Sequence, residues 1–257
     1  MRCQGRPLFL LTDFGTEDPW VGVLKGVIST LAPHVFVYDL SHAIPPGDIE
    51  AGLWFLTSSW DHLPPNAVVL ACVDPGVGSQ RPIRAVRCVN RWLVGPDNGL
   101  LGLPGRTLQT YHVPVPTNGA LNVASTFQAR DVMAPVAARL ASEGRPRLDP
   151  CGDELCCLEW IRMLPAGKVS TIPVVWVDRF GNVILPVRGA DLTERSVLRV
   201  LPDGPDMRRR THYAEGSEGE LFWLSGSHGF LELAMNQGSA AEFLGIIRGD
   251  GIVLQVG

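Results

Sequence analysis

The chain has 257 residues, 46% of them hydrophobic, and a net charge of −4. This length suits one large domain or two modest ones with a substantial core, and the acidic balance argues against a general nucleic-acid-binding surface. The sequence has no apolar run of transmembrane length and no signal peptide. We therefore expect no nucleic-acid partner, no membrane association and a cytoplasmic protein.

The cysteines also favour a reducing compartment. Cys72 and Cys88 lie in apolar runs typical of buried free thiols. Cys151, Cys156 and Cys157 lack both the spacing and the histidine partners of a zinc site. We expect no metal ligands among them, and a cytoplasmic location.

The first organised stretch is residues 8–26. An apolar strand over residues 8–11, buried on both faces, ends at the Gly turn after Asp13. Asp18 and Pro19 are typical of an N-cap and a first helical position, before a helix over residues 21–31. Asp13 is thus expected at the carboxyl end of a central strand, where open α/β sheets bind ligands. A carboxylate there suits the vicinal hydroxyls of a ribose, or a metal. The alternative is that Asp13 only caps the turn.

The next 120 residues alternate strands with helices. We predict strands over residues 35–40, 68–73, 83–89, 92–94 and 108–113, and helices over residues 49–59 and from a loop at 126 to residue 142. This alternation predicts an α/β domain with a mostly parallel central sheet flanked by helices. Four strands end near an aspartate, so we expect these side chains to converge along one sheet edge: Asp13, Asp39, Asp74 and Asp97.

The composition changes after about residue 150. Residues 151–169 resemble a linker or crossing segment, and beyond them helical periodicity disappears. Short strands are predicted over residues 173–177, 182–187, 197–201, 221–224, 230–235 and 252–256, which favours a small all-β barrel or sandwich. We therefore predict an N-terminal α/β domain, residues 1–165, and a C-terminal β-barrel domain, residues 166–257.

Five short motifs follow one another along the chain: Thr12-Asp13-Phe14-Gly15, Asp74-Pro75-Gly76-Val77-Gly78 with Arg81, Gly95-Pro96-Asp97-Asn98-Gly99, Asp178-Arg179-Phe180-Gly181-Asn182, and Ser227-His228-Gly229 with Leu231-Glu232. Each alone is a common kind of turn, but the ordered set is specific. In these motifs the chain resembles the S-adenosyl-L-methionine (SAM) hydroxide adenosyltransferase family. These are adenosine-forming SAM hydrolases, related to the SAM-dependent fluorinase and chlorinase. The resemblance runs from about residue 8 to residue 256.

The resemblance implies an N-terminal α/β domain, a C-terminal β-barrel and a homotrimer with active sites between subunits. It also implies that water or hydroxide attacks the ribose C5′ of SAM, so that methionine leaves and adenosine forms. The sulfonium is already a good leaving group, so we expect no metal and no cofactor. The protein has to hold the nucleophile in line and to exclude other water.

The resemblance also assigns roles to residues. Asp74, Arg81 and the position of Gln128 handle the water, and an ordinary turn ion pair is the alternative for the first two. Asp13 matches the aspartate that grips the ribose hydroxyls, and Asp18 a further acidic position of that motif. The other substrate-binding residues implied are Phe127, Asp178, Phe180, Asn182, Ser227 and His228. Of these, Asp178 and Asn182 match a motif that meets the methionine and adenine ends from a neighbouring subunit, and Ser227 a serine near the methionine carboxylate.

The sequence departs from the family at several of these positions. Gln128 replaces a histidine, and an amide cannot take a proton near neutral pH. If catalysis depends on that proton transfer, a factor of about 10²–10⁴ is lost. Ala129 offers no hydroxyl to hold a halide, which argues against fluoride but leaves room for a larger anion. Gly47 stands where relatives carry an aromatic residue, and His228 where the halogenases carry arginine.

Three alternatives to SAM hydrolysis stay open. Gln128 is compatible with a catalytically silent SAM- or adenosine-binding protein, and Ala129 with a SAM-dependent chlorinase. A metal-dependent phosphohydrolase is the third, because carboxylates at strand ends can hold Mg²⁺ or Mn²⁺. Its ligands would be Asp13, Asp74 and Asp97.

Overall fold

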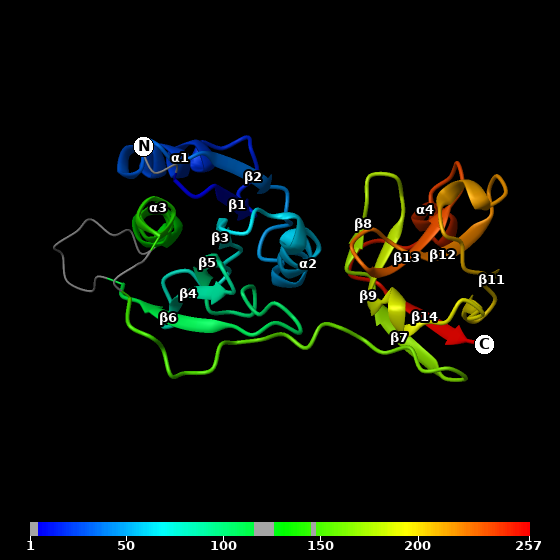
Figure 1. Ribbon diagram of the computed structural model, residues 1–257. Coiled ribbons are helices and arrows are strands. Elements are labelled where there is room, and N and C mark those ends of the chain that lie inside the picture. Colours follow the sequence, from blue (N-terminus) through cyan, green and yellow to red (C-terminus); the bar gives the residue numbers. More distant parts are fainter. Residues whose placement is uncertain (1–4, 116–125, 145–147) are drawn as a thin grey trace. The chain divides into compact units, whose positions relative to one another are not determined.

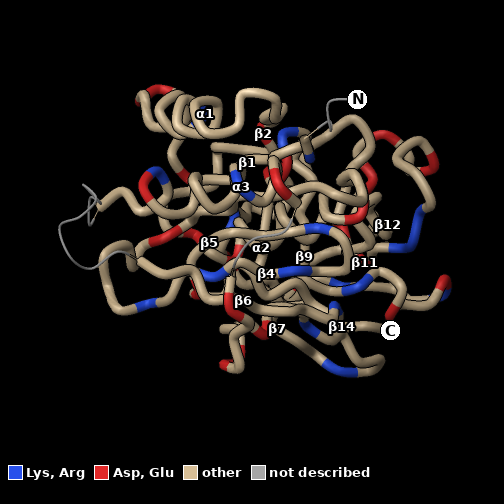
Figure 2. Tube along the Cα trace, turned by 60° about the vertical axis from the view of Figure 1, so that its left-hand side comes forward, with Lys and Arg blue, Asp and Glu red and all other residues tan. Residues whose placement is uncertain are grey.

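The computed structural model describes residues 5–115, 126–144 and 148–257. It divides into two compact units, Met1–Leu158 and Glu159–Gly257 (Figure 1). In the described part of the chain, no helix is long and apolar enough to cross a membrane. Acidic and basic residues are interspersed along the trace of both units (Figure 2), as a net charge of −4 suggests.

A six-stranded mixed sheet forms the centre of the N-terminal unit. Its strand order is β2-β1-β3-β5-β4-β6. The first four of these strands run parallel, whereas β4 is antiparallel to both β5 and β6. The strands are β1 (Leu8–Thr12), β2 (Val37–Ser41), β3 (Val68–Cys72), β4 (Ile83–Cys88), β5 (Arg91–Pro96) and β6 (Gln109–Val113).

Among the described residues, three α-helices accompany this sheet: α1 (Trp20–Leu31), α2 (Ile49–Ser59) and α3 (Ala134–Glu143). Helix α1 packs against α3, which contacts β1, β3 and β5, while α2 contacts β1. A π-helical turn, Ala129–Met133, leads into α3, and Gly144 follows α3 as a left-handed C-cap. A short 3₁₀ turn, Trp60–His62, follows α2. The core of this unit joins the strands to the helices, with Leu10, Leu70 and Val94 packed with Ile28 and Ala137.

The predicted positions of Asp18 and Asp39 are wrong. Helix α1 begins at Trp20, because Pro19 already has a helical backbone and occupies the N-cap, so Asp18 caps nothing. Asp39 lies inside β2, not at its end, because the pairing of β2 with β1 continues to Ser41. By contrast, Asp48 does cap α2, accepting a hydrogen bond from the backbone N–H of Ala51 at 2.9 Å.

The C-terminal unit consists of two antiparallel four-stranded sheets, ordered β11-β10-β14-β7 and β12-β13-β9-β8. Both contribute to one core, in which Ile172, Leu198 and Leu254 belong to the same cluster as Leu185 and Trp223. The elements are β7 (Val169–Pro173), β8 (Trp176–Val177), β9 (Val183–Arg188), β10 (Leu198–Val200), β11 (Asp206–Met207), β12 (Leu221–Ser225), β13 (Phe230–Met235), α4 (Ala240–Leu244) and β14 (Gly251–Val256), with 3₁₀ turns Gly189–Asp191 and Tyr213–Glu215.

The single strand predicted over residues 173–177 is wrong. Strand β7 ends at Pro173 and β8 begins at Trp176, because the N–H groups of Val174 and Val175 bond to Asp250 and Ile184 respectively. Helix α4 was not predicted from the sequence. This helix has five residues and is capped by Ser239, so it is too short to show a 3.6-residue period.

Gly95, in β5, should tolerate no side chain. A Cβ atom there would lie 2.3 Å from the carbonyl oxygen of Ala71, so we expect Gly95→Ala to destabilise the protein by about 1–3 kcal/mol. Gly22→Ala in α1 is the matched control, since its Cβ would meet nothing within 4 Å and alanine favours a helix by about 1 kcal/mol. Thermal unfolding should show a lower midpoint for Gly95→Ala and an equal or higher one for Gly22→Ala. Equal midpoints for Gly95→Ala and the wild type would contradict the packing.

Candidate active site

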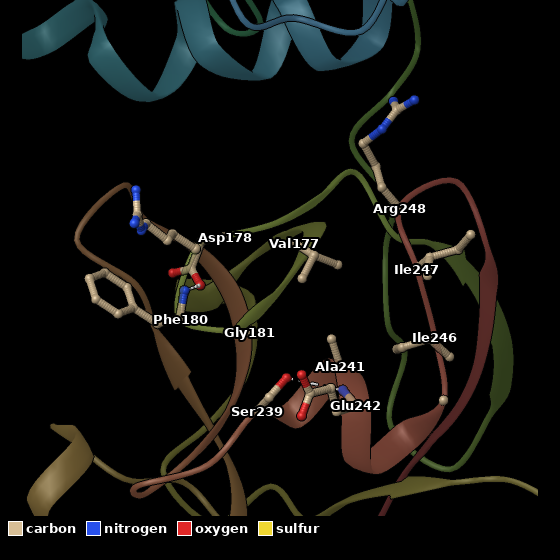
Figure 3. Close-up of a pocket in the computed structure, with 12 residues that line it drawn as sticks. Val177, Asp178, Phe180, Gly181, Ser239, Ala241, Glu242, Ile246, Ile247 and Arg248 are labelled. Carbon is tan, nitrogen blue, oxygen red and sulfur yellow. Dashed lines mark hydrogen bonds between the residues drawn. The ribbon is translucent and has the colours of Figure 1, made fainter.

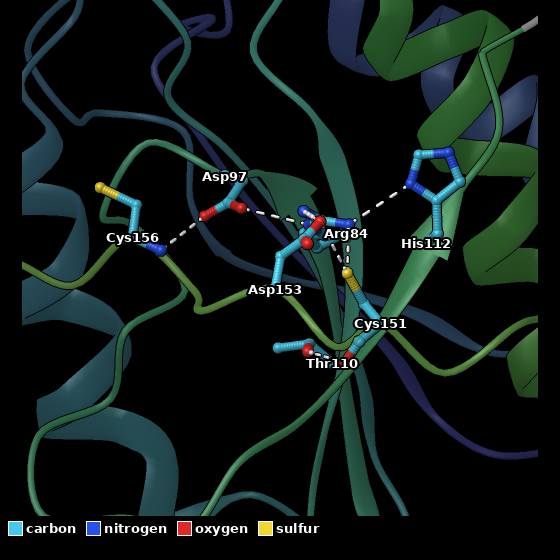
Figure 4. Close-up of polar contacts among 7 residues, drawn as sticks. All are labelled: Arg84, Asp97, Thr110, His112, Cys151, Asp153 and Cys156. Carbon is cyan, nitrogen blue, oxygen red and sulfur yellow. Dashed lines mark hydrogen bonds and ion pairs between the residues drawn. The ribbon is translucent and has the colours of Figure 1, made fainter.

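Three aspartates follow three neighbouring parallel strands, as predicted: Asp13 follows β1, Asp74 follows β3 and Asp97 follows β5. Asp97 nevertheless faces other partners, because its carboxylate accepts hydrogen bonds from Arg84 Nε at 3.1 Å and from the Cys156 N–H at 2.8 Å (Figure 4). Within the described ranges, no group of three or more His, Cys, Asp or Glu residues is placed to hold a metal ion. The geometry therefore does not favour the three-carboxylate metal site.

Arg81 links two of the predicted catalytic residues. Its Nε donates to Oδ1 of Asp74 at 2.7 Å, and its Nη2 donates both to Oδ2 of Asp74 and to Oε1 of Gln128. The side chains of Arg81 and Asp74 are only 10% and 4% exposed, and Gln128 is also buried. A buried two-pronged pair of this kind is stronger and better oriented than a surface ion pair. We call Asp74, Arg81 and Gln128 the buried trio below.

Local backbone structure places the members of this trio. Asp74 and Arg81 flank a tight turn in which Gly78 has a φ of +81°, a conformation that glycine adopts without strain. Gln128 is the residue before the π-helical turn. Because its Oε1 faces Arg81, its NH₂ group is free to point elsewhere. Arg81 Nη1 is buried and has no hydrogen-bond partner in the described part of the chain.

A cavity of about 70 Å³ lies beside the trio, which is room for about two water molecules. Four predicted site residues line it, namely Asp13, Asp74, Phe127 and Gln128, with Phe14, Cys72, Val77, Thr126 and Ala129. Arg81 instead lines an adjacent, more open hollow of about 420 Å³ that also includes Gln128. The structure thus brings together the residues assigned to ribose binding and to water handling.

Asp13 is held by a backbone group that the sequence analysis did not assign to it. Its Oδ2 accepts the N–H of Gly47 at 2.8 Å, and Gly47 has a φ of +75°. Burial raises the pKa of Asp13, the Gly47 hydrogen bond partly opposes this, and the nearby Asp74 carboxylate raises it further. The glycine that departs from the family pattern therefore has a structural role here.

Phe127 belongs to an aromatic cluster. Its ring centroid lies 5.8 Å from that of Phe14 and 5.6 Å from that of Trp20, both edge to face. The Arg130 guanidinium lies 4.9 Å from the Phe127 centroid. Phe127 thus forms a fixed apolar wall of the cavity. Phe14 and Cys72 were not predicted as lining residues, although Phe14 follows Asp13 directly and Cys72 lies two residues before Asp74.

In the C-terminal unit, Asp178 organises the turn between β8 and β9. Its Oδ1 accepts the N–H groups of Phe180 and Asn182, and its Oδ2 accepts Nδ2 of Asn182, all at 2.9 Å. Asn182 is buried, whereas Phe180 is 78% exposed. Asp178 and Phe180 line an open pocket of about 540 Å³ together with Ser239, Glu242 and Ile246 (Figure 3). Asn182 does not line this pocket and locks the turn instead.

The remaining predicted binding residues lie elsewhere. Ser227 is exposed in the turn between β12 and β13. His228 Nδ1 accepts the Phe230 N–H at 3.2 Å, and its Nε2 lies 3.5 Å from Oε2 of the buried Glu232. Both ring nitrogens of His228 therefore have partners within the chain. Asp18 is exposed and lines none of the cavities described above.

Comparison with known proteins identifies the family. The model of the SAM hydroxide adenosyltransferase N-terminal domain matches residues 8–148, and that of the C-terminal domain matches residues 172–253. The chain therefore belongs to the SAM hydroxide adenosyltransferase family, which confirms the resemblance.

Individual relatives agree over nearly the whole chain. The (R)-S-adenosyl-L-methionine hydrolase of Thermus thermophilus is 39% identical and matches over 95% of this chain and 97% of its own. The protein of that name from Salinispora tropica is 36% identical, over 96% of each. A solved structure, an uncharacterised conserved protein of Thermotoga maritima, superposes with a TM-score of 0.84 at 27% identity, covering 97% of this chain and 100% of that one.

Asp13→Asn should stabilise the folded protein at neutral pH. Burial raises the pKa of Asp13 above its ordinary value of 3.8, so the folded state binds this proton more tightly than the unfolded state and the charged form disfavours folding. The gain in the free energy of unfolding should be complete above the folded-state pKa of Asp13 and shrink as the pH falls towards 3.8. Urea unfolding of both proteins across this range measures it.

Asp39→Asn is the control of opposite sign. Burial would raise the pKa of Asp39, but the interactions with Lys25 and His42 outweigh it and lower that pKa. This variant should therefore lose stability at neutral pH, and the loss should fade as the pH falls through the lowered pKa. A change of the same sign in the free energy of unfolding of both variants would contradict the opposite pKa shifts of Asp13 and Asp39.

Proposed function

We propose that the protein hydrolyses SAM to adenosine and L-methionine by in-line attack of water or hydroxide on the ribose C5′. One observation carries the proposal: Asp74, Arg81 and Gln128 form a buried trio beside a cavity of about 70 Å³ that Asp13 also lines. The relatives from Thermus thermophilus and Salinispora tropica, both named (R)-S-adenosyl-L-methionine hydrolases, support the same reaction.

The chemistry needs little from the protein besides positioning. The new C5′–O bond forms as the C5′–S bond breaks, both electrons of that bond go to the sulfonium sulfur, and the attacking water loses one proton. Asp13 accepts hydrogen bonds from the two ribose hydroxyls, which fixes C5′ relative to the trio. The cavity admits few water molecules, so the nucleophile is both held and partly stripped of solvent.

Each member of the trio has a distinct part. The Arg81 guanidinium favours the hydroxide form of a neighbouring water, and Asp74 orients Arg81 and accepts the proton. Gln128 points its oxygen at Arg81, so its NH₂ group donates to the oxygen of the nucleophile and cannot remove its proton. Reduced general-base assistance should therefore make this enzyme slower than one with histidine at this position.

Several finer features belong to the proposal. We propose that the active enzyme is a homotrimer in which Asp178, Phe180, Asn182, Ser227 and His228 of a neighbouring subunit meet the methionine and adenine ends, while Asp18 keeps an accessory role beside the ribose. We further propose that it needs neither metal nor cofactor and works in the cytoplasm, which the free thiols of all five described cysteines support. Helices flanking the N-terminal sheet, barrel-like packing of the C-terminal sheets and a domain boundary at 165/166 stay predictions.

A second candidate is a protein that binds SAM or adenosine without turnover, which the replacement of histidine by Gln128 favours. A SAM-dependent chlorinase is the third, since the buried Ala129 lines the cavity and offers it no polar side chain.

Purified protein incubated with SAM at neutral pH should produce adenosine and methionine in equal amounts. Chromatography measures both products. Asp74→Asn should lower the rate by at least about 10²-fold, because Arg81 loses its orientation. Asp206→Asn is the matched control, since Asp206 forms an exposed two-pronged pair with Arg199 and should leave the rate unchanged. Loss of the wild-type activity in EDTA would contradict a reaction without a metal. Formation of 5′-chloro-5′-deoxyadenosine in chloride would contradict hydrolysis.

Substitutions of Gln128 separate a slow enzyme from a silent one. Gln128→His restores a group that can accept a proton and should raise the rate about 10–10³-fold, whereas Gln128→Leu, which cannot orient water, should lower it. Adenosine from Gln128→His but none from the wild type would favour the silent binding protein. No product from either, with tight SAM binding measured by calorimetry, would reject hydrolysis.

A further inference from the structure

The turn that carries Asp13 is held by hydrogen bonds on both sides of that residue. The Phe14 N–H donates to Oγ1 of Thr12 at 3.3 Å, which closes a short turn around Asp13. The Gly15 N–H donates to the carbonyl oxygen of His42 at 2.8 Å. Thr12 is fully buried, so its hydroxyl needs partners within the protein.

His42 supplies the second partner of this hydroxyl. Its Nδ1 lies 2.7 Å from Oγ1 of Thr12, and its side chain is 4% exposed. On the other side of the ring, Nε2 lies 3.0 Å from Oδ1 of Asp39, whose Oδ2 accepts a hydrogen bond from Lys25 at 2.7 Å. An irregularity in the pairing of β1 with β2, where Leu10 faces Asp39 but Leu11 faces Ser41, lies immediately before this contact, and such irregularities redirect side chains.

Donor and acceptor counting favours one direction for the bond between Thr12 and His42. Thr12 Oγ1 accepts from Phe14, and its single hydrogen is available for Nδ1 of His42. We therefore assign Nδ1 as the acceptor, which places the ring hydrogen on Nε2. Nε2 lies at ion-pair distance from the Asp39 carboxylate but forms no hydrogen bond in the described part of the chain. With the opposite assignment, the Thr12 hydrogen would have no acceptor among the hydrogen bonds of the described residues. A chain of polar contacts therefore extends from Lys25 and Asp39 at the surface, through His42 and Thr12, to the turn at Asp13.

We infer that His42 is a positioning residue for ribose binding. Through the Thr12 hydroxyl and its own carbonyl oxygen, it fixes the turn of residues 12–15, so that the Asp13 carboxylate meets both ribose hydroxyls. The inference rests on the proposed function, because it takes Asp13 to be the ribose ligand. His42 itself lines none of the cavities described above, so its effect must pass through Asp13.

The test compares His42→Leu with His42→Asn. Asparagine can place its side-chain oxygen near the position of Nδ1 and accept the Thr12 hydroxyl, whereas leucine cannot. We expect His42→Leu to raise both the KM for SAM and the Kd for adenosine about 10- to 100-fold with kcat changed less than about threefold, since Asp13 holds the ribose equally in substrate and transition state. His42→Asn should return both constants to within about threefold of the wild type. His34→Leu is the matched control, since this histidine is exposed and its one side-chain hydrogen bond among the described residues is to Ser142.

A double-mutant cycle with Asp13→Ala distinguishes positioning from general loss of structure. If His42 acts through Asp13, adding His42→Leu to Asp13→Ala should weaken adenosine binding by less than about twofold more. Losses that multiply, or a His42→Leu variant that binds like the wild type, would overturn the inference. If His42→Leu does not fold, Thr12→Val breaks the same bond from the other side and should give the same increase in Kd. A wild-type protein that binds neither SAM nor adenosine would refute the proposed function itself, and the inference with it.

Discussion

The candidate site depends on the enclosed cation of Arg81. Arg81 is almost completely enclosed, and an arginine cannot shed its proton in a protein. Burying it is unfavourable unless a carboxylate and further acceptors meet it. Asp74 supplies the carboxylate through two hydrogen bonds and Gln128 supplies an amide oxygen. The turn after β3, the sheet edge and the entry to α3 must therefore keep fixed relative positions.

That requirement also limits what position 128 can do. In this chain the amide oxygen is already committed to Arg81, so only the NH₂ group remains for a substrate or water. The site thus combines an arginine and an amide donor with the carboxylates of Asp74 and Asp13 across a cavity of about 70 Å³. Such an arrangement orients a small nucleophile but offers little base strength, which fits a reaction whose leaving group is already activated.

Much of this site could be predicted from the sequence, because strand ends and turns leave strong local signals. Asp13, Asp74 and Asp97 do follow adjacent parallel strands. Local signals could not show that Asp97 turns towards Arg84, or that Asp39 lies within β2, since both depend on contacts between distant segments. The backbone N–H of Gly47 at Asp13 has no signature in residue type at all. Helix α4 and strand β11 could not be predicted, because elements this short carry no periodic pattern.

The π-helical turn after Gln128 has an evolutionary consequence. A π turn amounts to one extra residue within an α-helix, and here the Ala134 N–H bonds to the carbonyl oxygen five residues earlier, that of Ala129. Loss of any one residue between 129 and 133 would convert this turn to a regular helix and rotate Gln128 by about 100° relative to α3. Its side chain would then leave Arg81 while the buried face of α3 stayed in place. Insertions and deletions in this short segment are therefore a route by which relatives could change the chemistry at this site and keep the fold.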